Sequence, residues 1–272
     1  MTYTHILLRT GEIFLKGKNR SYFGRILLQN IQKMSKISVK KLRFRWITAY
    51  FEAHHHLQRI FGLTSYSPAV RVEKDITMIE TKALELLHTK AGTFRVETNR
   101  ADKSFPMASH EINVKIGQFI EQNSSLRFKV KEFDTLLSIE INQDGAYLFL
   151  ETVVCLGGLP VGVEGKVAVL LEEEASLLAA LLCMKRGCNI ILLGFKKIDF
   201  SLVQKFTTAS VQFIQVKDWT EIERYIQKEN LSIVSGQSFS NFKSYSKNIV
   251  FRPLIAYTPE RVTAELEHFK SL

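Results

Sequence analysis

The segment KVAVLLEEEASLLAALLCMKRGCNIILL, residues 166–193, determines the fold expected for the second half of the chain. It reads as an apolar strand, a turn, a helix over 173–186 and a second apolar strand. Strands that are apolar without alternation are typical of a parallel sheet covered by helices. In such sheets the turn after a strand often binds phosphate at the start of the next helix. Here the turn carries Glu172, Glu173 and Glu174, which are carboxylates at a place where an anion would bind.

Strands and helices continue to alternate toward the end of the sequence, which predicts an α/β domain over residues 161–272. Its last helix has Pro259 near its start, where proline is well tolerated. Ahead of this domain lies CLGGLPVGVEGK, residues 155–166, whose four glycines and one proline indicate a connector. The other elements expected are strands over 189–195, 211–216 and 231–237 and a helix over 219–229.

The first 160 residues predict two smaller α+β domains. Residues 1–72 follow the order βαββαβ, which is the ferredoxin-like arrangement. Residues 73–160 predict a helix, the strand TFRVETNR, a second helix with Ser109 as its N-cap, and three short strands. The fold class is therefore α+β followed by α/β, with a trimmed parallel sheet at the end.

Length and composition place the chain among globular proteins. It has 272 residues, of which 46% are hydrophobic, and its apolar runs are shorter than the roughly 18–20 residues of a membrane span. The first residues lack the features of a secretory signal. Three cysteines are too few for a disulfide framework. We therefore expect a reduced, cytoplasmic protein without a membrane partner.

Positive charge is concentrated at the beginning of the sequence. The formal net charge is +10, and residues 1–60 contain twelve Lys or Arg against two acids, whereas the rest of the chain is balanced at 25 of each. A basic lobe with interleaved aromatic residues favours a polyanion such as nucleic acid as its partner. A generic solvated basic face is the alternative.

The stretch LKGKNR places Lys16, Lys18 and Arg20 at the start of a predicted helix. Cations at this end of a helix oppose the helix dipole, so helix stability does not explain their presence. We predict that these three residues contact phosphates. The neighbouring triplet His54–His56 predicts no metal site, because consecutive side chains point in different directions.

Six motifs occur along the chain in a fixed order and spacing: RTGEIFLKGKNRSYF, RADKSFPMASHEINVKIGQFI, LGGLPVGVEGKVAVLL, AALLCMKRG, SGQSFSNF and RPLIAYTPE. Together they resemble the tRNA 4-thiouridine synthetases, which are tRNA sulfurtransferases, over essentially the whole chain. The resemblance implies a ferredoxin-like N-terminal domain, a THUMP RNA-binding domain and a PP-loop ATP-pyrophosphatase domain.

The resemblance adds a second group of candidate RNA-binding residues. The THUMP domain of this family is implicated in recognising the acceptor end of tRNA, and RVETNRADKSFP matches its segment. Arg95, Arg100 and Lys103 offer charge for phosphates, and Phe105 offers a ring for base stacking. A packed turn at Phe105 is the alternative.

The resemblance also identifies the glutamate turn as a degenerate PP-loop. The family pattern is Ser-Gly-Gly-x-Asp-Ser, in which glycines let the backbone reach the phosphates. Aligned back from Ser176, the sequence here reads Leu171, Glu172, Glu173, Glu174, Ala175, Ser176. The family pattern continues past RPLI into a catalytic-cysteine segment that this sequence does not include. We therefore expect no catalytic residue, no metal and no ATP or magnesium binding.

Two cysteines near this turn leave several interpretations open. CMKRGC places Cys183 on the predicted helix and Cys188 at the start of the next strand. They fit two small buried hydrophobic residues, a sulfur relay or, least of all, a metal site.

The sequence thus predicts a shortened, tRNA-binding relative of the thiouridine synthetases that lacks ATP-dependent adenylation of its own. Its expected partners are tRNA, at the acceptor end, and a separate catalytic protein, and family analogy suggests a homodimer. The alternative is an active tRNA sulfurtransferase that uses a rearranged site or a partner subunit. A structural remnant without an RNA role is a third interpretation.

Overall fold

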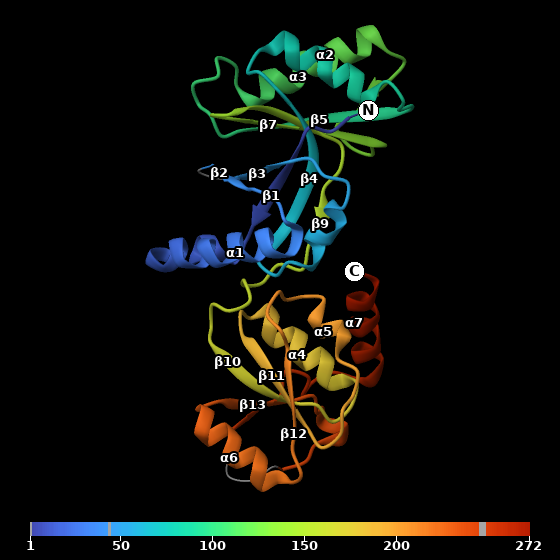
Figure 1. Ribbon diagram of the computed structural model, residues 1–272. Coiled ribbons are helices and arrows are strands. Elements are labelled where there is room, and N and C mark those ends of the chain that lie inside the picture. The colour runs from blue at the N-terminus through green and yellow to red at the C-terminus, as the bar shows by residue number, and fades with distance from the viewer. Residues whose placement is uncertain (1, 43–44, 245–248) are drawn as a thin grey trace. The chain divides into compact units, whose positions relative to one another are not determined.

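The computed structural model describes residues 2–42, 45–244 and 249–272. The chain forms two compact units, each built from several stretches of sequence (Figure 1). The first unit contains the described residues of Met1–Arg9, Ser38–Glu52 and Tyr66–Val153. The second contains Thr10–Ile37, Ala53–Ser65 and the described residues of Val154–Leu272.

The first unit is organised around a nine-stranded sheet in the order β2-β3-β1-β4-β8-β7-β5-β6, with β9 pairing to β4. Four strands come from the predicted ferredoxin-like segment and five from the segment that follows it. The strands are β1 (His5–Thr10), β2 (Lys40–Lys41), β3 (Trp46–Ala49), β4 (Leu63–Val72), β5 (Thr93–Arg100), β6 (Arg127–Phe128), β7 (Thr135–Asn142), β8 (Gly145–Phe149) and β9 (Val153–Val154).

Strand β4 joins the two segments into this one sheet. It pairs antiparallel with β8, so that Val70 lies opposite Leu148. A small apolar cluster covers the junction and includes Leu7, Ala69 and Tyr147, which are all buried. Backbone hydrogen bonds and apolar burial therefore both hold the two segments together.

Two helices, α2 (Ile76–Leu87) and α3 (Ser109–Asn123), cover one face of β5, β7 and β8 (Figure 1). Asp75 caps α2 by accepting a hydrogen bond from Met78 N at 2.9 Å. Helix α3 begins at Ser109 itself, and the residue at the cap position is Ala108, whose N–H donates to the Glu111 side chain at 2.6 Å. The predicted N-cap at Ser109 is thus wrong by one residue, because Glu111 satisfies the backbone from within the first turn.

The second unit contains a five-stranded parallel sheet in the order β12-β11-β10-β13-β14. In chain order this is 3-2-1-4-5, so the strand order reverses between β10 and β13. The strands are β10 (Lys166–Leu170), β11 (Asn189–Gly194), β12 (Gln212–Gln215), β13 (Ser232–Ser235) and β14 (Val250–Phe251). The helical elements are η1 (Glu12–Leu15), η2 (Gly17–Asn19), α1 (Arg20–Ser35), η3 (His54–Arg59), α4 (Ala175–Lys185), α5 (Ser201–Gln204), α6 (Trp219–Glu229), η4 (Phe239–Asn241) and α7 (Pro259–Ser271).

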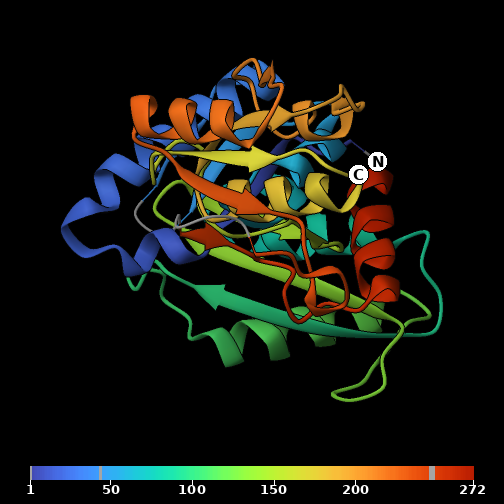
Figure 2. The ribbon, with the colours of Figure 1, turned by 90° about the horizontal axis from the view of Figure 1, so that it is seen from below.

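The three central strands of the second unit, β10, β11 and β13, are buried on both faces, as the sequence predicts. Val169 and Leu192 pack with α4, α5 and α7, whereas Ala168 and Ile191 pack with α6. Figure 2 shows α6 lying along one side of this sheet. Asp218 caps α6 by accepting from the backbone of its first turn. The predicted α/β class is confirmed.

The ferredoxin-like order of elements is confirmed, but its strands and helices belong to different units. Strands β1, β2, β3 and most of β4 lie in the first unit, whereas α1 and η3 lie in the second. The predicted connector is packed in the second unit, where Gly158 has φ +74° and a Cβ on it would lie 2.3 Å from Lys185 O. The three-domain division at residues 72 and 160 stays a prediction, since the compact units cut across it.

A charge cluster at the β7–β8 turn also ties the two segments of the first sheet together. Asp144 accepts hydrogen bonds from Lys40 of β2 and from the hydroxyl of Tyr147. Arg71 of β4 donates to Asp144 O at 3.1 Å and lies 3.4 Å from its carboxylate. The hydrogen bonds from Lys40 and Tyr147 lower the pKa of Asp144 to about 2.

We predict that Asp144→Asn destabilises the protein in a pH-dependent way. The folded-state pKa lies below the unfolded value near 4, so the stabilisation is present above pH 4 and is lost as the pH falls toward 2. The free energy of unfolding should drop by about 1–3 kcal/mol at pH 7 and by less at pH 3. Urea unfolding across this range measures it, with exposed Glu132→Gln as the control. A deficit that is equal at pH 7 and pH 3 would contradict the prediction.

Candidate nucleic-acid interface and switch-point loop

Two adjoining hollows of about 500 and 290 Å³ open in the first unit and share Asn99, Lys103 and Glu140. We call them together the Glu140 groove. The register of β5 against β7 places Asn99 beside Glu140, so both side chains leave the same face of the sheet. Cations outnumber carboxylates in the lining, whose charged residues are Arg9, Arg45, Arg100, Lys103, Glu97 and Glu140.

Glu140 is buried in this groove between two arginines from distant parts of the sequence. Arg9 Nη2 donates to Glu140 Oε1 at 3.0 Å. Arg45 donates through Nε to Oε2 at 2.6 Å and through Nη2 to Oε1 at 2.9 Å. Arg9 also donates to Ser67 Oγ at 2.9 Å and lies over the Phe149 ring at 5.1 Å. One carboxylate held by two guanidinium groups gives this group of three side chains one net positive charge.

Asn142 presents a buried donor to the same groove. It is 6% exposed, its Oδ1 accepts from Asp144 N at 2.8 Å, and its Nδ2 has no acceptor among the described residues. Leaving a buried donor unsatisfied costs about 1–3 kcal/mol, so such a donor is a candidate ligand contact. Sequence reasoning missed this residue and Glu140, although Ser138, Glu140 and Asn142 alternate with apolar residues along β7.

The structure divides the candidate residues of the THUMP segment among different environments. Lys103 is exposed and lines both hollows, and Arg100 lines one of them. Arg100 Nη1 donates to Phe105 O at 2.7 Å and so closes the turn between them. Arg95 lies elsewhere, donating to Val130 O at 3.3 Å. Phe105 is 6% exposed and packs in the core under α2 and α3, so its ring is not placed to stack on a base.

The N-terminal candidates belong to the second unit, whereas the Glu140 groove belongs to the first. Lys18 is exposed and has no ion-pair partner within the described part of the chain. Arg20 is exposed and lies over the Phe14 ring at 4.2 Å. Lys16 is 3.5 Å from Glu164 and 4.8 Å from the Phe23 ring, so part of its charge is already paired.

The glutamate turn lies between β10 and α4, at the edge of the sheet where the strand order reverses. Ligands of open α/β sheets bind at such switch points. Glu172 N and Glu173 N point to Ser176 Oγ, at 3.2 and 3.4 Å. Helix α4 begins at Ala175, so the prediction of a helix from residue 173 is wrong: the glutamates precede the helix, because Ser176 turns the chain back.

Carboxylates of this turn have partners within the second unit. Asn241 Nδ2 donates to Glu173 Oε1 at 2.9 Å. Lys270 of α7 is 2.8 Å from Glu174, and hydrogen bonds with Glu174 and Glu267 raise the pKa of Lys270. Backbone N–H groups and carboxylates that would meet a phosphate are thus engaged in contacts inside the protein.

The two cysteines near the turn have the properties of buried packing residues. Burial raises the pKa of Cys183 to about 12, and burial also raises the pKa of Cys188. Thiolate is the reactive form of cysteine, so both shifts disfavour nucleophilic chemistry. Among the interpretations left open by the sequence, the environment fits small buried hydrophobic residues best.

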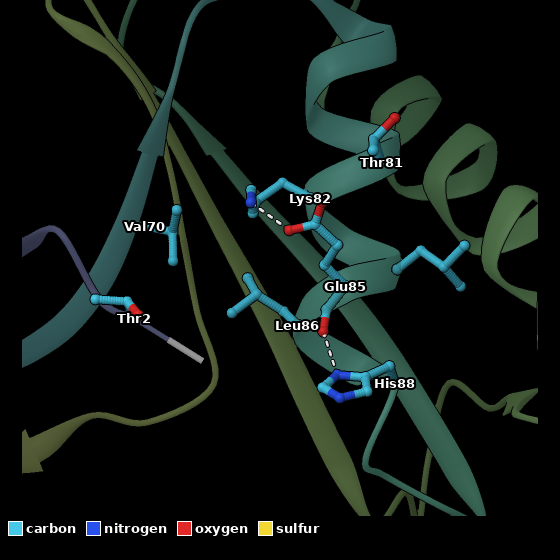
Figure 3. A pocket seen from close by; sticks show the side chains of 8 residues that line it. Thr2, Val70, Thr81, Lys82, Glu85, Leu86 and His88 are labelled. Atoms are coloured by element: carbon cyan, nitrogen blue, oxygen red, sulfur yellow. Dashed lines mark hydrogen bonds and ion pairs between the residues drawn. The ribbon is translucent and has the colours of Figure 1, made fainter.

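A further hollow of about 450 Å³ lies between α2 and β4 in the first unit (Figure 3). Its lining is mostly apolar, and Lys82 forms an ion pair with Glu85 there. The His88 ring nitrogen Nδ1 lies 2.7 Å from Glu85 O. The hollow contains none of the candidate RNA-binding residues. Its lining residues are Thr2, Val70, Thr81, Lys82, Leu84, Glu85, Leu86 and His88.

The structure combines a ferredoxin-like segment, a THUMP-like segment and a parallel α/β sheet. Comparison with known proteins gives the same assignment for the first two segments. Residues 5–67 match the family model of the ThiI ferredoxin-like domain, and residues 73–151 match the THUMP domain. A probable tRNA sulfurtransferase of Brevibacillus brevis is 37% identical over 215 residues, covering 74% of this chain and 54% of the relative. One of Mycoplasmopsis synoviae is 34% identical over 253 residues, covering 89% and 65%. The chain belongs to the tRNA sulfurtransferase, or 4-thiouridine synthetase, family.

Solved structures share the fold over almost the whole chain. PH1313 from Pyrococcus horikoshii matches with a TM-score of 0.83 at 27% identity and covers 98% of this chain and 99% of that one. A 4-thiouridine synthetase, solved as an RNA complex with bound ATP, matches with a TM-score of 0.83 at 22% identity, covering 98% and 85%. The chain spans 54% and 65% of the length of the two curated relatives. No helix within the described residues is long and apolar enough to cross a membrane.

The position of Phe105 leads to a prediction that separates packing from base stacking. Phe105→Ala removes a buried ring from the core of the first unit and should lower the free energy of unfolding by about 3–5 kcal/mol. Denaturant unfolding measures it. A variant that keeps wild-type stability but loses RNA affinity would show that the ring acts by stacking instead.

Proposed function

We propose that the chain binds tRNA and serves tRNA thiolation, without ATP-dependent adenylation of its own. The match to the THUMP domain and the relatives named probable tRNA sulfurtransferases support the RNA role. The observation that carries the proposal is the Glu140 groove, a cation-rich hollow in the unit that contains the THUMP segment. RNA backbones are recognised through such concentrations of Lys and Arg.

Two surfaces contribute to tRNA binding in this proposal. Lys103 at the Glu140 groove offers an exposed charge to phosphates, and Asn142 offers a buried donor. Lys18 and Arg20 offer a second set of cations in the other unit. Arg20 over the Phe14 ring also gives a flat cationic surface of the kind that single-stranded bases stack upon.

The second part of the proposal concerns ATP. A polyphosphate at the β10–α4 turn would have to compete with Ser176 for the N–H groups of Glu172 and Glu173. It would also meet their carboxylates, and a pair of like charges about 4 Å apart costs roughly 4 kcal/mol at an effective dielectric constant of 20. The residues of this turn therefore do not suit the phosphates of ATP. A separate catalytic protein would then supply the sulfur chemistry, and a homodimer is the expected assembly by analogy.

We predict that purified protein binds a tRNA transcript with micromolar or tighter affinity at low salt, weakening steeply as salt rises. Lys18→Ala and Lys103→Ala should each weaken binding severalfold, because each removes an exposed cation from a proposed RNA surface. Fluorescence anisotropy titrations measure the affinity. Lys228→Ala on α6 is the matched control, with the same change of charge outside both surfaces. Equal losses in all three variants would mean that net charge alone decides binding.

We also predict that ATP does not bind at the Glu172–Glu174 turn. Isothermal titration with millimolar ATP, with and without magnesium, should give no binding heat. Micromolar binding that disappears in the Glu172→Ala, Glu173→Ala, Glu174→Ala variant would contradict the prediction. It would instead favour the alternative function, an active tRNA sulfurtransferase whose carboxylates hold a metal that bridges to phosphate.

A further inference from the structure

We propose that Glu140 is a positioning residue for RNA binding. It fixes the guanidinium groups of Arg9 and Arg45 in the Glu140 groove in the orientation that receives an RNA phosphate. The inference rests on the proposed function, since it takes RNA as the occupant of the groove. From its charge alone, Glu140 would be expected to repel RNA. The inference instead gives this carboxylate a role in binding an anion.

The first argument is geometric. Arg45 meets Glu140 through two donors, Nε at 2.6 Å and Nη2 at 2.9 Å, and this paired contact fixes the plane of its guanidinium group. The same carboxylate fixes Arg9 through Nη2 at 3.0 Å. No described residue accepts a hydrogen bond from Arg45 Nη1, so its N–H groups remain for a further acceptor.

The second argument is entropic. A free arginine side chain samples many rotamers, and part of this freedom is lost when it binds a ligand. Glu140 holds both guanidinium groups before RNA arrives, and their side chains are only 17% and 19% exposed. Side chains that are already ordered bind a phosphate with a smaller loss of freedom.

A third, independent observation marks the groove as a place for a ligand. Asn142 lies two residues after Glu140 on the same strand face, is more than nine-tenths buried, and has an unsatisfied Nδ2 donor among the described residues. A donor beside the Arg45 and Glu140 pair suits an acceptor such as a phosphate or ribose oxygen. Arg45 and Asn142 line the same 290 Å³ hollow.

The test compares two substitutions that remove the same charge. Glu140→Gln removes the carboxylate that holds the arginines. Glu97→Gln removes an exposed carboxylate from the lining of the same groove. Glu97 forms its ion pair, at 3.9 Å, with Arg95, which does not line the groove. Affinity for a tRNA transcript is measured for both variants and the wild type over a series of salt concentrations.

The two variants should change affinity in opposite directions. Removing a negative charge at Glu97 should tighten binding about twofold, with an unchanged salt slope. Removing it at Glu140 should weaken binding about tenfold, which corresponds to 1.4 kcal/mol. Its plot of log affinity against log salt should also become shallower by about 0.7–0.9 for each phosphate that the variant no longer binds. A merely structural defect would lower the fraction of active protein without changing that slope.

Several outcomes decide the inference. Binding by Glu140→Gln that equals or exceeds that of Glu97→Gln overturns it, whereas absence of binding by the wild type overturns the proposed function as well. If Glu140→Gln does not fold, as judged by circular dichroism, Arg45→Lys takes its place, because it keeps the charge but cannot donate two hydrogen bonds in the same plane. Arg45→Lys should bind severalfold more weakly, and wild-type affinity in this variant also overturns the inference.

Discussion

The pairing of β4 with β8 is the constraint on which the first unit depends. Every backbone N–H and C=O inside a sheet needs a partner, and β4 lies between β1 and β8 in the sheet order, so it joins strands from both segments. The ferredoxin-like strands and the THUMP strands therefore form one surface. Arg9 and Glu140 meet on it although 131 positions separate them in the sequence.

The carboxylates of the two units have different partners, and these partners set the local charge. A buried charge is tolerated only when it is paired and hydrogen-bonded. Glu140 is matched by two arginines, so its surroundings stay positive. At the β10–α4 turn, Glu173 is held by a neutral amide, and Glu174 shares its lysine, Lys270, with Glu267. The first arrangement leaves a net positive charge around the carboxylate, whereas the second leaves the exposed carboxylates of Glu173 and Glu174 with a net negative charge.

The sequence predicts those parts of the structure that depend on local patterns. Unbroken apolar runs predict the parallel strands, because burial on both faces leaves no polar side. The cap at Ser109 and the start of α4 are predicted wrongly, since Glu111 and Ser176 supply backbone partners that residue preference alone does not reveal. The contact of Glu140 with Arg9 and Arg45 could not be predicted from the sequence, because these three residues come close only through the pairing of strands.

The residues predicted from the sequence to bind RNA differ in their exposure to solvent. Lys18 and Lys103 are exposed, as expected of residues that meet solvent or RNA. Phe105 is buried, because a large apolar side chain in a tight turn gains more from the core than from solvent. A motif therefore identifies a segment, whereas the packing of each side chain decides whether it stays open to solvent.

The α/β unit has a structural role that does not require ATP. Phe61, which follows η3, is 1% exposed, and its ring centroid lies 5.8 Å from that of Phe206 and 6.4 Å from that of Phe269. The core of the parallel sheet thus contains a residue of the ferredoxin-like segment. Lys18 in η2 and Arg20 at the start of α1 belong to the same unit. Removing this sheet would expose Phe61, and the elements that contain Lys18 and Arg20 would lose the core of their unit. The parallel sheet therefore has a packing role that is separate from any chemistry at its switch-point turn, because fold and chemistry are separable.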